Sequence, residues 1–294
     1  MTTVGWVLEA IAAVAVVALL VVRVVLRARR RPRILVRESA GFRELWLTAR
    51  GLATLQSRMS RADPLMSGIP YTDGFHLYPP ASGAVLFLGG GAAVTPRQFV
   101  AFYPALRVRV VEHDRAVLAT ARDRFGLAAD DRLEIQLGDG RAALERPGEW
   151  ALIVIDAFGA GDFPSSLATV EAFRLARDRL APGGAVAANL AGCLTGPVLR
   201  GVVAGLVEVF GADRTVLFGV PAIGSDPPYD PARCGNSVAF GFRDGLPEEP
   251  PGSRVPARAR PRLRYLEGIA ALRRPPETGA PHHDATAPPT LPIG

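Results

Sequence analysis

The stretch Val85-Leu86-Phe87-Leu88-Gly89-Gly90-Gly91 decides the fold of this chain. Its apolar half predicts a buried strand over 84–88, and its three glycines predict a turn whose backbone can approach a ligand closely. The sequence Thr-Pro-Arg-Gln at 95–98 then predicts a helix start, with the threonine as N-cap and the proline in the first position. Strand, turn and helix in this order open an α/β unit.

The alternation of strands and helices continues along the chain. Capping residues such as Asp114 and Thr169 mark the helix starts. Strands are expected over 107–111, 133–137, 152–155 and 185–189 and near 214–218 and 237–242, and helices over 115–125, 170–180 and 198–210. This pattern predicts a Rossmann-like α/β domain over residues 71–243, with a mostly parallel, seven-stranded sheet covered by helices on both faces.

The segments on either side of this domain have a different character. Residues 34–70 lack helix periodicity, and short apolar runs over 34–37, 44–48 and 52–56 predict a small β-element. Residues 244–294 are rich in proline and arginine, which predicts a mostly disordered tail with a short helix around 263–272.

The N-terminal segment predicts a membrane anchor. Residues 4–26 are apolar apart from Glu9 and Arg23, and a helix of this length spans about 34 Å, enough for a hydrocarbon core. No basic residue precedes the segment, whereas five arginines follow it over 27–33. The positive-inside rule then predicts a single-pass protein of the cell membrane, with its N-terminus outside, its main domain cytoplasmic and membrane lipid as a partner. A signal peptide and a buried core helix are less favoured alternatives.

The composition excludes several classes of function. All 34 basic residues among the 294 are arginine, so chemistry that needs a lysine amine is excluded. Removing the five arginines over 27–33 from the formal net charge of +6 leaves +1, which argues against nucleic acid as a partner. The two cysteines, Cys193 and Cys234, lack metal-ligand spacing, so neither a zinc site nor a disulfide framework is expected.

Four features fall at the carboxyl ends of the predicted strands, where open parallel sheets bind their ligands. The glycine triplet 89–91 offers backbone N–H groups at a helix start. Glu112 ends the second strand, and an acid at that place receives ribose hydroxyls. Asp139 follows the third strand and can accept from an adenine amino group, while Asp156 ends the fourth, where the reacting end of the ligand lies. Each acid alone could be a helix cap or turn residue, but their order predicts an adenosine-type ligand.

At these positions the chain resembles the spermidine synthase-like (polyamine aminopropyltransferase) branch of the class I S-adenosylmethionine-dependent methyltransferase fold. The resemblance extends from about residue 38 to residue 242. Its motifs lie at 85–91, 110–114, 138–141, 155–158 and 180–184, and two further matches lie upstream at 56–57 and 71–74.

The resemblance implies aminopropyl transfer from decarboxylated S-adenosylmethionine to a putrescine-like amine, without a metal. It assigns the general base to Asp156 and the positioning of the amine to Gln56 and Tyr71. It also implies a homodimer. The co-substrate contacts that it implies are Gly89, Gly90, Gly91, Glu112, Asp139 and Gly140.

Two positions depart from the family pattern. Ala92 stands where active members have an acid that holds the amino group of the co-substrate, and Gly159 stands where they have a second acid for the amine. Asp162 is the candidate substitute for the second acid. Two alternatives therefore stay open: methyl transfer from S-adenosylmethionine on the same fold, and a catalytically degenerate module that binds a nucleoside. A nicotinamide-dependent dehydrogenase fits the motifs less well.

Overall fold

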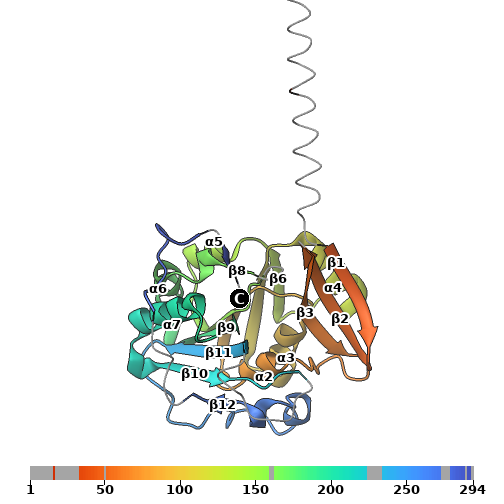
Figure 1. Ribbon diagram of the computed structural model, residues 1–294. Coiled ribbons are helices and arrows are strands. Elements are labelled where there is room, and N and C mark those ends of the chain that lie inside the picture. Colours follow the sequence, from red (N-terminus) through yellow and green to blue (C-terminus); the bar gives the residue numbers. More distant parts are fainter. Residues whose placement is uncertain are drawn as a thin grey trace, which may run out of the picture.

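The computed structural model describes residues 16, 33–49, 51–158, 162–223, 234–272, 279–288 and 290–292. An eight-stranded sheet forms the centre of the described part, and a separate three-stranded sheet lies at its side (Figure 1). The strand order in the large sheet is β12-β10-β11-β9-β7-β4-β5-β6.

The large sheet is mostly parallel. Its parallel strands are β4 (Gly83–Leu88), β5 (Leu106–Glu112), β6 (Leu133–Leu137), β7 (Trp150–Ile155) and β9 (Leu180–Gly192). The antiparallel strands at one edge are β11 (Gly235–Phe242), β10 (Thr215–Gly219) and β12 (Ala270–Ala271). This arrangement confirms the Rossmann-like α/β prediction with a mostly parallel sheet. The described sheet has one strand more than the seven expected, because β12 comes from the segment for which disorder was expected.

Helices cover both faces of the sheet, because both faces are apolar. The core on one face includes side chains of α2 (Pro70–Gly74), α3 (Val94–Phe102) and α4 (Arg115–Phe125). The core on the other face includes side chains of α5 (Gly140–Glu145), α6 (Val170–Asp178) and α7 (Pro197–Phe210).

Capping side chains explain where three of these six helices begin, namely α4, α5 and α6. Asp114 accepts from the N–H of Ala116 at the start of α4, and Thr169 accepts from Ala172 at the start of α6, as predicted. The start of α3 differs from its prediction. Ala93 precedes this helix in a left-handed conformation with φ 55° and provides no side-chain cap, while Thr95 lies inside the first turn.

The small β-element is an antiparallel sheet of β1 (Arg33–Ser39), β2 (Phe42–Ala49) and β3 (Leu52–Ser60). Leu45 pairs with Ser57 and Trp46 with Leu55, so Gln56 is an extra residue in β3 and forms a β-bulge. Apolar side chains join this sheet to α3 and α4. The bulge lies against the main domain, because a Cβ on Gly91 would lie 3.5 Å from the backbone oxygen of Gln56.

The described residues of the C-terminal segment differ from the expected disorder. Val255, Ala259, Leu263 and Leu266 are at most 7% exposed and belong to the core of the main domain. The helix expected over 263–272 is replaced by a 3₁₀ turn, Leu266–Gly268, and strand β12. Widely spaced apolar residues between the prolines anchor this segment without a regular helix, and composition alone does not reveal such anchors.

The expectation of a membrane anchor needs correction. Within the part of the chain that the structure describes, no helix combines the length and apolar character needed to cross a membrane. This finding contradicts the predicted localisation as a single-pass membrane protein, and that prediction is withdrawn. The segment on which it rested, residues 4–26, lies outside the described residues except for Val16.

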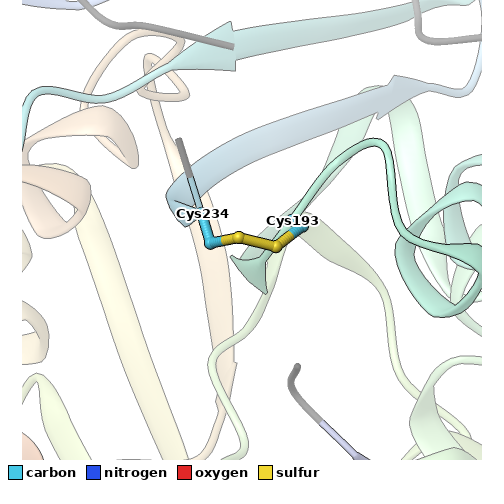
Figure 2. Close-up of a disulfide and its surroundings, with 2 residues drawn as sticks. All are labelled: Cys193 and Cys234. Atoms are coloured by element: carbon cyan, nitrogen blue, oxygen red, sulfur yellow. A yellow bond between two sulfur atoms is a disulfide. The ribbon is translucent and has the colours of Figure 1, made fainter. Parts of the chain in front are cut away.

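The cysteines also differ from expectation. Cys193 and Cys234 form a disulfide with a sequence separation of 41 residues (Figure 2). Cys193 follows the last residue of β9, and Cys234 precedes the first residue of β11. These two strands are hydrogen-bonded neighbours, so the sheet brings together two cysteines that lie far apart in the sequence.

Candidate functional site

The candidate site lies where the strand order of the large sheet changes direction. The chain passes from β4 to β5 and β6 on one side and to β7 and β9 on the other, so the turns after β4 and β7 leave a crevice between them. A cavity of about 350 Å³ opens there. Nine of the ten predicted site residues line it: Gln56, Tyr71, Gly89, Gly90, Gly91, Glu112, Asp139, Gly140 and Asp156.

The turn after β4 requires glycine at two positions. Gly89 has φ +93°, and a Cβ there would lie 2.2 Å from the backbone oxygen of Asp156. Gly91 has φ +49°, and a Cβ there would lie 2.4 Å from Oγ of Ser57. The triplet therefore packs between the end of β7 and the bulge of β3, where no side chain fits.

Ser57 joins the small sheet to this turn. Its hydroxyl accepts from the N–H of Ala92 over 2.9 Å. Ala92 is fully buried and packs with Leu45 and Met59 of the small sheet. An ionised acid at this position would lie in apolar surroundings, where burying its charge is costly.

Glu112 holds the glycine turn from the end of β5. Its Oε2 accepts from the N–H of Gly90 over 3.0 Å and of Gly91 over 3.2 Å, and Oε1 accepts from Asp114 N over 2.9 Å. Burial alone would raise the pKa of Glu112, but hydrogen bonds from His113, Asp114 and Gly90 outweigh burial and hold the pKa below its usual value. The carboxylate is therefore charged and fixed at the wall of the cavity.

Asp139 and Gly140 form the turn after β6. Oδ1 of Asp139 caps α5 by accepting from Ala142 N over 2.9 Å, which leaves Oδ2 as the oxygen that does not cap the helix. A Cβ on Gly140 would lie 3.1 Å from the side chain of Leu167. Leu167 also lines the cavity, so this end of the cavity combines a carboxylate with an apolar wall.

Asp156 follows β7 at the other end of the cavity. Its Oδ1 accepts from Nδ2 of Asn189 over 3.0 Å, and Oδ2 accepts from the hydroxyl of Tyr71 over 3.4 Å. Burial raises the pKa of Asp156 to about 6, against the hydrogen bonds from Asn189 and Tyr71, which lower it; the carboxylate of Glu112 raises it further. A carboxylate with this pKa can take up a proton near neutral pH.

Asn189 and Asn236 also belong to the candidate site, although the sequence did not predict them. Asn189 is 2% exposed within β9, and its Oδ1 accepts from Nδ2 of Asn236 in β11 over 2.9 Å. Both residues line the cavity. Asn189 is the single amide in the apolar run Ala185–Leu190. A buried polar side chain needs a hydrogen-bond partner, so this amide was the signal in the sequence that could have indicated a polar contact there.

The predicted amine-binding residues lie in three different environments. Tyr71 lies beside Asp156, and burial together with that carboxylate raises the pKa of its phenol well above the usual value. Gln56 lines the cavity from the bulge of β3. Asp162 is the first residue of β8 (Asp162–Pro164), and Gly159 lies outside the described residues.

The cavity thus has two chemically distinct ends. Glu112 and Asp139 present carboxylates beside the glycine turn, which suits a ribose and a base. Asp156 and Tyr71 present a proton acceptor and a hydroxyl at the other end. The arrangement suits a reaction in which a nucleoside-linked group meets a second molecule that must lose a proton.

The chain was compared with protein families, curated proteins and solved structures. No family model matches the chain. The polyamine aminopropyltransferase of Nitrosomonas europaea is 32% identical over 147 residues, which are 48% of this chain and 45% of that protein. A probable spermidine synthase from Corynebacterium glutamicum has a similar structure, with a TM-score of 0.62 and 23% identity, covering 89% of this chain and 100% of the other.

A second solved structure shares the fold. A spermidine synthase in complex with the transition-state analogue AdoDATO has a TM-score of 0.50 and 20% identity, covering 74% of each chain. The matched region spans less than half the length of the curated relatives. The chain is therefore similar in sequence to polyamine aminopropyltransferases over part of its length, and it shares its fold with spermidine synthases of known structure.

Proposed function

We propose that this spermidine synthase-like chain is a transferase that moves an aminopropyl group from decarboxylated S-adenosylmethionine to a putrescine-like amine. The observation that carries the proposal is Asp156, a carboxylate held by Tyr71 and Asn189 in the cavity that also contains Glu112 and the glycine turn. The named relatives and the AdoDATO complex support the same co-substrate class.

The chemical step needs one base. The amine nitrogen attacks the propyl carbon next to the sulfonium, a C–N bond forms, and the C–S bond breaks. Its electron pair goes to sulfur, so neutral methylthioadenosine leaves. The proton of the incoming ammonium goes to Asp156, whose raised pKa of about 6 makes it a better acceptor than an ordinary carboxylate.

Asn189 and Tyr71 would orient the base. Both are neutral donors, so they fix the two oxygens of Asp156 without adding a charge at the reacting end of the cavity. Tyr71 and Gln56 both line the cavity, and we propose that they contact the incoming amine. Each of these contacts aligns the lone pair of the amine with the C–S bond.

Glu112 and Asp139 would bind the nucleoside part. A charged Glu112 can accept from both ribose hydroxyls, and Oδ2 of Asp139 can accept from an adenine amino group. Because the glycines have no side chains, the turn leaves room for the ribose of the ligand next to the carboxylate of Glu112. Buried Ala92 provides no carboxylate for the amino group of the co-substrate, and since S-adenosylmethionine and its decarboxylated form both carry that group, this position does not select between them.

The experiment that tests the proposal is product detection by mass spectrometry. The full chain is incubated with putrescine-like amines and with either decarboxylated S-adenosylmethionine or S-adenosylmethionine. We expect methylthioadenosine and an aminopropylated amine from the first mixture. Appearance of S-adenosylhomocysteine alone, from the second, would favour methyl transfer instead, and binding of nucleoside without turnover would favour a degenerate module.

Asp156→Asn is the decisive variant. We expect turnover to fall at least about 100-fold, because the amide cannot take the proton. The variant should remain folded and unfold at a higher temperature at pH 7.5, because it removes a charge that burial destabilises. Glu134→Gln, an exposed carboxylate paired with Arg109, is the matched control and should retain wild-type turnover.

A further inference from the structure

The C-terminal segment runs across α6 to the mouth of the cavity. We call residues 279–288 and 290–292 the C-terminal strap. It ends in β13 (Thr290–Pro292), which pairs with β8 in an antiparallel two-stranded sheet. Leu291 is 2% exposed and belongs to the core on the α6 face. The end of the strap is therefore packed into the domain, against residues that lie far from it in the sequence.

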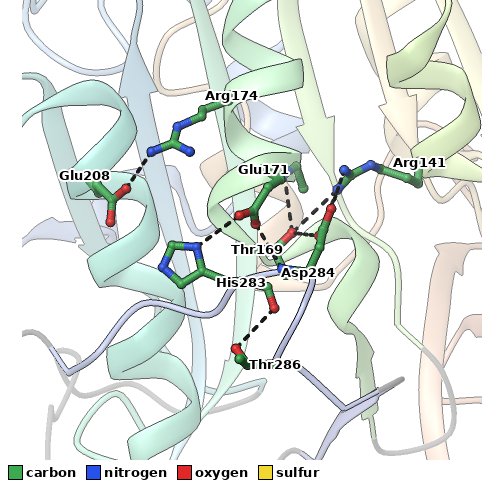
Figure 3. A network of polar contacts seen from close by, with 9 residues as sticks. Arg141, Thr169, Glu171, Arg174, Glu208, His283, Asp284 and Thr286 are labelled. Carbon is green, nitrogen blue, oxygen red and sulfur yellow. Dashed lines mark hydrogen bonds and ion pairs between the residues drawn. The ribbon is translucent and has the colours of Figure 1, made fainter.

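A cluster of polar contacts holds the strap on α5 and α6 (Figure 3). Asp284 of the strap accepts from Nη2 of Arg141 over 2.7 Å and from the hydroxyl of Thr169 over 2.6 Å. The N–H of Asp284 donates to Oε2 of Glu171 over 3.0 Å, and His283 contacts Oε1 of the same carboxylate at 3.0 Å. Charge-assisted contacts of this kind are the stronger class of hydrogen bond.

The same cluster adjoins the nucleoside end of the cavity. Arg141 follows Gly140, a residue of the cavity wall, and also donates to the backbone oxygen of Ser166 over 3.2 Å. Thr290 of the strap pairs with Pro164, and both line the cavity. The strap thus supplies one wall of the cavity at the end where Asp139 lies.

From these contacts we infer that the strap forms the closing wall of the nucleoside site, with Arg141 and Asp284 as positioning residues. The inference rests on the proposed function, since it concerns the same site. A nucleoside seated between Asp139, Leu167 and Thr290 contacts the strap, so docking of the strap and binding of the nucleoside stabilise each other. The reciprocal effect gives two independent readouts.

The test uses the full chain and methylthioadenosine as the probe. In Asp284→Ala the two contacts to Arg141 and Thr169 are lost while the pocket-lining residues stay. We expect the Kd from isothermal titration to rise about tenfold, which is 1.4 kcal/mol. Arg174→Ala is the matched control, because it breaks an exposed ion pair to Glu208 on the same face without touching the strap.

Hydrogen exchange measured by mass spectrometry supplies the second readout. In the wild type, methylthioadenosine should slow exchange in peptides that cover 279–292, and Asp284→Ala should show fast exchange there without ligand. Equal affinity of the wild type and Asp284→Ala, with no ligand effect on those peptides, would overturn the role of the strap alone. Absence of nucleoside binding by the folded wild type would overturn the proposed function and this inference together.

Discussion

Asn189 donates from Nδ2 to Oδ1 of Asp156 over 3.0 Å, from β9, the strand next to the one that Asp156 follows. Its own Oδ1 accepts from Asn236 in the next strand, β11. Three neighbouring strands therefore fix the orientation of one carboxylate. Because an amide cannot lose a proton, the chain places a neutral donor on Asp156 and leaves that carboxyl as the titrating group of the three.

Replacing Asn189 tests this arrangement. In Asn189→Ala, Asp156 loses a donor that lowers its pKa, so the acid limb of the pH–rate profile should move above its wild-type position, which the pKa of about 6 places near pH 6. The rate above that limb should fall about 10- to 100-fold, since a hydrogen bond to a charged group contributes about 1.5–3 kcal/mol. Turnover measured between pH 5 and 9 gives both quantities.

Asn236→Ala is the control for that variant, because it removes the amide one step further from Asp156. Asn236→Ala should lower the rate less than Asn189→Ala does, and it should leave the acid limb of the pH–rate profile closer to its wild-type position. If both variants lower the rate equally and leave the pH profile unchanged, Asn189 acts through packing of β9 rather than through Asp156.

Glu112 provides a second prediction, on binding rather than on rate. In the wild type, the N–H groups of Gly90 and Asp114 donate to different oxygens of Glu112. Glu112→Gln keeps the shape of the side chain but leaves one acceptor oxygen for both of them. We expect methylthioadenosine affinity to fall about 10- to 100-fold, because a charged acceptor for the ribose is lost. Isothermal titration measures this, with Glu134→Gln as the control. Unchanged affinity would place the ribose elsewhere in the cavity.

The sequence predicted the parallel core well because each of its signals is local. The strand expected over 133–137 coincides with β6, and the capping residues Asp114 and Thr169 mark the helix starts that they were expected to mark. The end-of-strand acids were found because parallel strands carry their carboxyl ends to one edge of the sheet. Strand periodicity and helix caps placed the glycine turn and the three acids that line the cavity, whereas Gln56 and Tyr71 were expected only from the resemblance.

The features that were missed depend on contacts between distant parts of the chain. Asn189 acquires its role only when β7, β9 and β11 pair, and Asp284 only when the C-terminal strap meets Arg141, 143 residues earlier. The two cysteines meet because β9 and β11 are neighbours in the sheet. Composition predicted disorder for the segment after 244, since its few buried apolar residues are separated by prolines and arginines.

Asp73 gives a prediction about stability. Burial raises its pKa to about 8, although a hydrogen bond from Tyr265 N and the charge of Arg264 act in the opposite direction. The folded state therefore binds a proton that the unfolded state releases near pH 4. Stability should fall as pH rises between about 4 and 8, by up to about 1.4 kcal/mol per pH unit, and level off above pH 8.

The variant that isolates this effect is Asp73→Asn, which cannot titrate. Its free energy of unfolding, measured with urea at pH 5, 7 and 9, should decline less with pH than that of the wild type. The difference between the two proteins removes contributions from other groups, which both share. Parallel pH dependences in the two proteins would mean that Asp73 titrates in its ordinary range and that its buried environment admits water.

The disulfide between Cys193 and Cys234 closes a loop with a separation of 41 residues, and reducing it should destabilise the fold by up to about 4 kcal/mol through the entropy of the unfolded chain. Because Asn236 lies two residues beyond Cys234, reduction should also lower turnover. Thermal unfolding and turnover are measured with and without dithiothreitol, in the wild type and in Cys193→Ser/Cys234→Ser. The wild type should approach the double variant when reduced, while the variant should not respond. A wild type with two titratable thiols and an unchanged Tm would show that pairing of β9 with β11 holds this edge without the covalent bond.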